Sequence, residues 1–214
     1  DFGFEADIIR ALGRILAAGH VTRGHKPVHW CIDCGSALAE AEVEYADRTS
    51  PAIDVRFTVA DEAEFIGRCE HAKGQGPISI PIWTTTPWTL PANHAVALHP
   101  DLEYQLLQCA GLRGVERLLI AEPLVKAALA RYGIEDYRVV ANCQGRTLEG
   151  VKLKHPFYAR EVPVILGEHV TTDAGTGAVH TAPGHGLEDY IVGSRYGLPV
   201  DNPVGGDGKF LPGT

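Results

Sequence analysis

Apolar residues recur at helical spacing in only one long stretch, at the start of the chain. Phe4, Ile8, Leu12 and Ile15 lie three or four positions apart and would fall on one side of a helix. A glycine follows as a stop signal. This pattern predicts a helix over residues 4–18.

The next segment changes character. Residues 26–30 look extended and lead into a turn at residues 31–35. Over residues 40–45 glutamates alternate with Ala, Val and Tyr, which predicts a half-exposed strand. We expect residues 1–45 to form a connecting flank and residues 201–214 to form an exit segment.

From about residue 52 the pattern has the period of β-strands, because Ile53, Val55, Phe57 and Val59 alternate with polar residues. Similar runs predict further strands at residues 78–82, 94–98, 103–108, 117–121, 137–141, 151–154 and 162–166. Helices are predicted from the Asp61 cap to Ile66, at 123–132 and at 187–196, and a polar loop at 68–76. The result is an α+β, β-rich fold, a β-barrel decorated with short helices over residues 46–200.

Composition narrows the classes of function. The 214 residues, 45% of them hydrophobic, suit one sizeable domain, and the absence of methionine leads us to expect a piece of a longer protein. A net charge of −8 argues against extensive duplex binding but allows contact with a short single-stranded end. No apolar run approaches the roughly 18–20 residues of a membrane span. The five cysteines are an odd number, which favours a reducing cytoplasm.

Cys31 and Cys34 have the spacing of a zinc knuckle. A structural zinc site normally needs four ligands, and the sequence has no second pair of cysteines. Two interpretations stay open. These residues are either half of a zinc site that the full-length protein completes, or ordinary reduced cysteines.

The first segment that could carry chemistry is residues 83–93, which read WTTTPWTLPAN. Thr84, Thr85 and Thr86 form a row of hydroxyls with restricted rotamers at the end of a predicted strand. Pro87 forces the preceding residue into an extended conformation. Such hydroxyls can orient a water or a ribose hydroxyl. The alternative is a Thr-rich strand end whose hydroxyls only cap the backbone.

The second segment is residues 175–190, which read GTGAVHTAPGHGLEDY. Its glycines let the backbone approach a ligand closely, and His180 follows them on a short apolar strand. Asp189 falls in the first turn of the last predicted helix, where a carboxylate is favoured and could bind an ammonium group. The alternatives are a turn-rich loop or a metal triad of His180, His185 and Asp189, whose spacing matches no helical ligand pair.

Both segments resemble the editing insertion of isoleucyl-tRNA synthetases, and residues 26–45 resemble the segment that leads into it. Valyl and leucyl relatives usually carry arginine where this chain has Thr86, which favours the isoleucyl branch. The two signature motifs of the synthetic site are absent from the sequence. The resemblance therefore implies an editing β-barrel without ATP-dependent activity.

The resemblance also implies a reaction. One methylene in a pocket is worth only about 1–3 kcal/mol, a limit for which the isoleucyl enzymes are themselves the standard example, so a second site must hydrolyse valine esters and exclude isoleucine by size. The expected substrate is the 3′-terminal aminoacyl-adenosine of tRNA(Ile), bound by a monomeric fragment. The alternatives are a non-catalytic module that binds the tRNA acceptor end and, more distantly, a metal hydrolase.

Residue roles follow from the matching motif positions. Asp189 would anchor the α-ammonium group, and Thr84, Thr85 and Thr86 would place the water. His180 would form the wall that excludes isoleucine. Trp88 and Asn93 would shape the pocket or hold the terminal adenosine, and further substrate contacts are expected from Gly177 and Ala178. No cofactor is expected for editing, and a structural zinc is possible only in the full-length protein.

Overall fold

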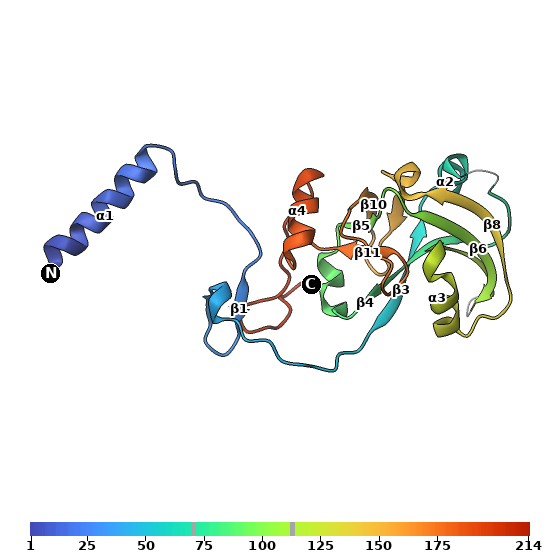
Figure 1. Cartoon of the computed structure of the whole chain (residues 1–214), viewed down its shortest axis with the longest axis horizontal. Helices are drawn as coiled ribbons and strands as arrows, with labels where there is room; N and C mark the ends of the chain where they lie inside the picture. The colour runs from blue at the N-terminus through green and yellow to red at the C-terminus, as the bar shows by residue number, and fades with distance from the viewer. Residues whose placement is uncertain (70–71, 112–113) are drawn as a thin grey trace.

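The computed structural model describes residues 1–69, 72–111 and 114–214, and its centre is one mixed sheet of nine strands (Figure 1). The strand order is β11-β5-β10-β9-β3-β4-β7-β6-β8. Neighbours are antiparallel except for β5 with β10 and β4 with β7. The strands are β3 (Ile53–Val59), β4 (Ile78–Thr84), β5 (Ala95–Leu98), β6 (Glu103–Gly111), β7 (Gly114–Ala121), β8 (Tyr137–Gln144), β9 (Lys152–Lys154), β10 (Glu161–Leu166) and β11 (Ala178–Thr181).

The predicted α+β, β-rich class is confirmed, but within the described residues the strand ladders form a curled sheet and do not close into the predicted barrel. Strand β11, at one end of the order, also lies close to β4. Among the described residues the strand ladders leave β11 and β8 as two open edges. Pro81 helps to explain why β4 and β11 form no ladder, because proline offers no N–H for one. On this side β4 pairs with β7 only at Ile78 and Ser79.

A threonine bridges the gap instead. The Oγ1 hydroxyl of Thr176, just before β11, donates to the carbonyl oxygen of Pro81 at 2.6 Å. The backbone N–H of Ala121, at the end of β7, donates to the carbonyl oxygen of Thr176 at 2.9 Å. These two bonds attach the loop before β11 to both neighbouring strands.

Two apolar clusters stabilise the curl. The larger one fills the inside of the sheet and contains the inward-facing residues of β3, β4, β6 and β7 together with helices α2 (Glu62–Arg68) and α3 (Val125–Tyr132). The smaller one joins Ala95, Ala97 and Ile165 of the sheet to Val192 of helix α4 (Leu187–Arg195). Helix α4 is therefore held against β5 and β10, next to the end of β11.

The predicted flank contains helix α1 (Phe2–Ala17), which has no buried residue and lies apart from the sheet (Figure 1). It begins two residues earlier than predicted because the Asp1 side chain accepts from the N–H of Gly3. In the described part of the chain, no helix has both the length and the apolar character needed to cross a bilayer.

The strand predicted at residues 40–45 is wrong. A 3₁₀ helix, η1 (Glu40–Glu42), occupies this position, and the Glu42 carboxylate accepts from the N–H of Ala39 at 2.8 Å. Alternation alone could not make a strand, since no strand among the described residues pairs with this segment. The hairpin before it, β1 (His29–Cys31) and β2 (Ser36–Leu38), contacts the exit segment instead, because Trp30 Nε1 donates to the carbonyl oxygen of Gly206 at 2.8 Å.

The other predicted elements are present, with shifted ends. Strand β4 continues two residues beyond its predicted end, to Thr84, and the helix predicted at 123–132 begins with the 3₁₀ turn η3 (Glu122–Leu124). Further 3₁₀ turns are η2 (Pro87–Ala92) and η4 (Gly145–Leu148). Within the loop predicted at 68–76, residues 70–71 lie outside the described residues.

Candidate active site

The row of threonines lies where β4 ends and η2 begins. Thr84 is buried, and its Oγ1 accepts from the backbone N–H of Thr86 at 3.0 Å and lies 3.2 Å from the Thr86 hydroxyl. Thr85 and Thr86 are exposed. Pro87 then starts η2, as expected for a residue that fixes φ at the first helical position. The Thr84 hydroxyl thus helps to turn the chain, and the two residues that follow it are exposed.

Opposite this row, the glycines before β11 bring backbone close to the sheet. Gly177 has φ +76°, and a Cβ atom there would lie 2.3 Å from Cβ of Ala121. Its carbonyl oxygen accepts from the fully buried Tyr104 hydroxyl at 2.6 Å. Only glycine fits both the backbone angle and the space.

The hollow between these segments has a volume of about 280 Å³. This is near the lower end of ligand pockets, which typically span about 300–1,000 Å³. Four predicted site residues line it: Thr84, Thr85, Gly177 and Ala178. Its remaining lining residues are Trp83, His169, Thr171, Asp173, Ala174, Gly175, Thr176 and Val179.

His180 lies beside the threonine segment but outside this lining. Its side chain is 6% exposed, and Nε2 is 3.0 Å from the Thr89 hydroxyl. Thr89 already donates its single proton to the carbonyl oxygen of Thr86 at 2.8 Å. Nε2 of His180 must therefore carry the proton in this contact. Burial lowers the pKa of His180 to about 4, so the ring is neutral at pH 7.

Asp189 lies near the C-terminal end of β11 and is not among the residues that line the hollow. In the first turn of α4, its Oδ2 accepts from the backbone N–H of Ala182 at 2.8 Å. Burial raises the pKa of Asp189 above its usual range, while the Ala182 bond and nearby His169 oppose that rise. Burial therefore works against the ionisation that the helix N-terminus was expected to favour.

The remaining predicted site residues, Thr86, Trp88 and Asn93, also lie outside the hollow's lining. Trp88 is 49% exposed and accessible to a ligand. Asn93 is fully buried, and its amide donates to the carbonyl oxygen of Ala95 at 2.8 Å. This burial favours a role in shaping the site over direct contact with an adenosine.

Unpaired polar atoms gather around β11. Among the described residues, six buried side-chain N or O atoms have no hydrogen-bond partner: Asn93 Oδ1, Arg160 Nε, His169 Nε2, His180 Nδ1, Thr181 Oγ1 and His185 Nε2. Leaving such a group unpaired costs about 1–3 kcal/mol. Native proteins keep such groups mainly where they serve a function or bind water or an ion.

No group of three or more metal-binding side chains occurs among the residues that the structure describes. Cys31 and Cys34 lie on the β1–β2 turn, where the N–H of Cys34 donates to the Cys31 sulfur at 3.2 Å. A side-chain hydrogen bond from Cys34 and, after it, this backbone bond lower the pKa of Cys31. The half zinc site stays a prediction for the full-length protein.

Two contributors were not singled out from the sequence. Thr89, the partner of His180, sits inside the 83–93 segment, but nothing in the local pattern distinguishes it from the other threonines. His169 lines the hollow from the turn between β10 and β11, where the sequence has no period to interpret. Only the packed structure brings these residues to the site.

Three comparisons place the chain among known proteins. Residues 1–175 match the family described as tRNA synthetases class I (I, L, M and V). Over its whole length the chain is 64% identical to the isoleucine–tRNA ligase of Nitrosococcus oceani and 66% identical to that of Thioalkalivibrio sulfidiphilus. It spans only 23% and 22% of the length of these two relatives.

The fold is similar to solved editing domains. The editing domain of the Plasmodium falciparum cytosolic leucyl-tRNA synthetase matches with a TM-score of 0.55 at 11% identity, covering 65% of this chain and 63% of that chain. The P. knowlesi domain gives 0.54 at 12%, covering 69% and 64%. These likenesses concern the fold, and they agree with the resemblance found in the sequence. The chain belongs to the class I tRNA synthetases of the isoleucyl, leucyl, methionyl and valyl group.

Proposed function

We propose that this chain is the editing domain of an isoleucyl-tRNA synthetase and hydrolyses the ester of valine wrongly attached to tRNA(Ile). The observation that carries the proposal is the small hollow between two segments far apart in sequence. Thr84 and Thr85 line one side, and Gly177 and Ala178 line the other. Such a hollow suits a small aminoacyl group at the end of a nucleic acid strand.

In this mechanism Asp189 binds the α-ammonium group of the ester. The hydroxyls of Thr84, Thr85 and Thr86, with a ribose hydroxyl, orient a water toward the ester carbonyl. Neither site segment places a serine or cysteine beside a base, so positioning of water is favoured over a covalent intermediate. His180 lies beside the threonine segment and outside the lining of the hollow, and its neutral ring, hydrogen-bonded to Thr89, has the rigidity that a size-excluding group next to the hollow needs.

The same proposal covers partners and cofactors. The domain acts in the cytoplasm on the 3′-terminal aminoacyl-adenosine while attached to the rest of its synthetase, and the isolated fragment is a monomer. Its acidic charge limits contact to the acceptor end. Editing needs no metal, and a zinc bound through Cys31 and Cys34 would serve the structure of the full-length protein.

The decisive experiment measures release of valine from valyl-tRNA(Ile) by the full-length protein and its Asp189→Ala variant. Loss of the carboxylate should abolish hydrolysis because the ammonium anchor is gone. Glu188→Ala is the matched control, since Glu188 is exposed in the same helical turn. Near-normal turnover by Asp189→Ala would remove the anchor role.

The competing function is a non-catalytic module that binds the tRNA acceptor end. It predicts that the unmodified protein binds tRNA(Ile) but releases no valine. The same assay with a binding measurement therefore separates the two functions.

A further inference from the structure

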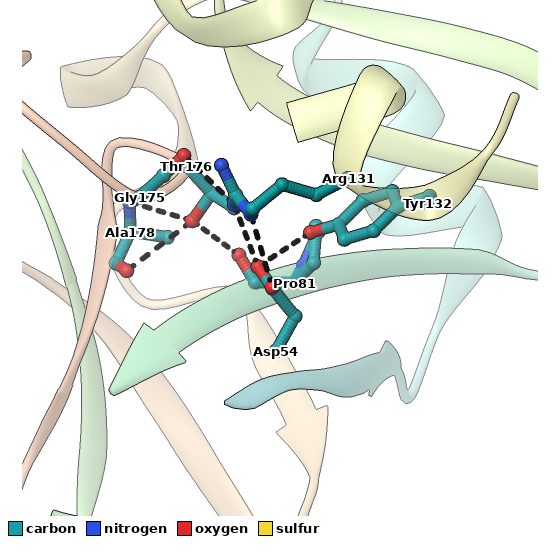
Figure 2. Close-up of polar contacts among 7 residues, drawn as sticks. All are labelled: Asp54, Pro81, Arg131, Tyr132, Gly175, Thr176 and Ala178. Carbon is teal, nitrogen blue, oxygen red and sulfur yellow. Dashed lines mark hydrogen bonds and ion pairs between the residues drawn. The ribbon is translucent and has the colours of Figure 1, made fainter. Parts of the chain in front are cut away.

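One wall of the hollow is held by an arginine of helix α3 that does not itself line the hollow. Figure 2 shows Arg131, on the last turn of α3, reaching toward the loop before β11. Its NH2 group donates to the carbonyl oxygen of Gly175 at 3.2 Å. Gly175 lines the hollow, whereas Arg131 does not. Arg131 thus contacts the wall of the hollow without lining the hollow itself.

The guanidinium is itself fixed by Asp54 on β3. NH2 of Arg131 lies 2.9 Å from Oδ1 and Nε lies 3.3 Å from Oδ2, so the two groups form a two-point ion pair. The Tyr132 hydroxyl donates to the same carboxylate at 2.7 Å. Paired charged hydrogen bonds of this kind define orientation as well as attraction.

The loop before β11 is also closely packed on the side that faces Trp83. Gly175 has φ +82°, and a Cβ atom there would lie 3.2 Å from Cβ of Trp83, another lining residue. The next residue, Thr176, is buried and donates to the Pro81 carbonyl oxygen. The Gly175 carbonyl is therefore held by Arg131, and the next residue is held by Pro81, as the dashed contacts of Figure 2 show.

We propose that Arg131, held by Asp54, is a positioning residue that sets the width of the hollow and thereby its choice between valine and isoleucine esters. This inference rests on the proposed editing function. A hollow that rejects one additional methylene group needs a wall that is not displaced even by a fraction of an ångström. The bonds of Thr176 hold the next residue of the loop, and the Asp54–Arg131 pair adds a hold on the Gly175 carbonyl itself.

The test replaces Arg131 in the full-length protein and measures kcat and KM for valyl- and isoleucyl-tRNA(Ile). Arg131→Met should reduce the ratio of kcat/KM for valine over isoleucine about tenfold, since small displacements of positioning groups have effects of this size or more. Any fall in kcat/KM for valyl-tRNA(Ile) itself should appear in kcat rather than in KM. Lys126→Met is the control, because it removes an exposed cation from the same helix.

Two further variants guard against a purely structural effect. Asp54→Asn should lower the ratio as Arg131→Met does, and the double variant should add nothing more. Arg131→Lys keeps the charge for Asp54, but a single ammonium cannot reproduce the planar fork that spans Asp54 and Gly175. It should therefore fold normally, which its thermal midpoint would report, and still lose discrimination.

The outcomes separate this inference from the function on which it rests. An unchanged ratio in folded Arg131→Lys and Arg131→Met, while the unmodified protein edits valine, would overturn the positioning role. Release of no valine by the unmodified protein would instead defeat the proposed function. In that case the ratio of affinities for non-hydrolysable valyl- and isoleucyl-adenosine analogues replaces the kinetic ratio, with the same expected loss.

Discussion

His180 and Thr89 form a buried hydrogen bond of 3.0 Å between two segments that both belong to the candidate site. The Thr89 hydroxyl donates its own hydrogen bond to the carbonyl oxygen of Thr86, so the imidazole is connected through one hydroxyl to the threonine row. This connection fixes the tautomer of His180 and the position of its ring. It also makes the site sensitive to protonation.

We expect the protein to lose stability as pH falls from about 6.5 to about 4. Burial lowers the pKa of His180 to about 4, so between these values the unfolded chain binds a proton that the folded chain does not. His180 alone would account for roughly 3 kcal/mol. His155 and His185, whose pKa values are also lowered by burial, act in the same direction.

Denaturant unfolding at a series of pH values checks this prediction. The His180→Gln variant should show a shallower decline over the same range, since one of the three titrating groups is gone. Identical slopes for the variant and the unmodified protein would contradict the assigned burial effect.

Thr89→Val should destabilise the protein and weaken size discrimination. Valine keeps the branched shape but leaves the Nε2 proton of His180 without an acceptor, at a cost of about 1–3 kcal/mol. With its ring no longer held, His180 becomes a softer wall, and isoleucyl-tRNA should be hydrolysed faster. Thr89→Ser, which retains the hydroxyl, is the control and should discriminate normally. Equal discrimination by both variants would argue against a role for this hydrogen bond.

Valine editing should have an acidic limb above the usual aspartate range, which centres near 3.9. The ammonium anchor requires ionised Asp189, and burial raises the pKa of that carboxyl. The pH profile of kcat/KM for valyl-tRNA(Ile), corrected for uncatalysed hydrolysis, reports this limb. Because His169 lowers the pKa of Asp189, His169→Gln should move the limb to higher pH. A shift to lower pH would contradict the assignment.

Gly177→Ala should destabilise the fold by more than a left-handed backbone angle alone explains. That angle costs an alanine roughly 1–2 kcal/mol, and a Cβ atom at position 177 would in addition overlap Cβ of Ala121. Gly150→Ala is the matched control, since Gly150 has φ +84° with open space around it. Thermal unfolding should rank the variants, with Gly177→Ala clearly less stable. Equal losses would mean that the loop moves aside freely.

The sequence by itself determined the local elements and the residue types available for chemistry. Alternation across Ile53, Val55, Phe57 and Val59 predicts strand β3, because one face of a strand must be buried wherever it lies. The same argument failed at residues 40–45, since a strand also needs a partner that the local pattern does not specify. The threonine row and the glycines near Gly177 were visible as patterns, as was the resemblance that connects them.

Tertiary structure decided how those patterns meet. The hollow joins the end of β4 to the start of β11, and Thr89 meets His180 across 91 residues of chain. Arg131 reaches Gly175 across 44 residues, although nothing in its own helix marks it out. Local periodicity records only which face of an element is apolar. Contacts between distant polar groups depend on how the sheet curls, and that curl is a property of the whole packed core.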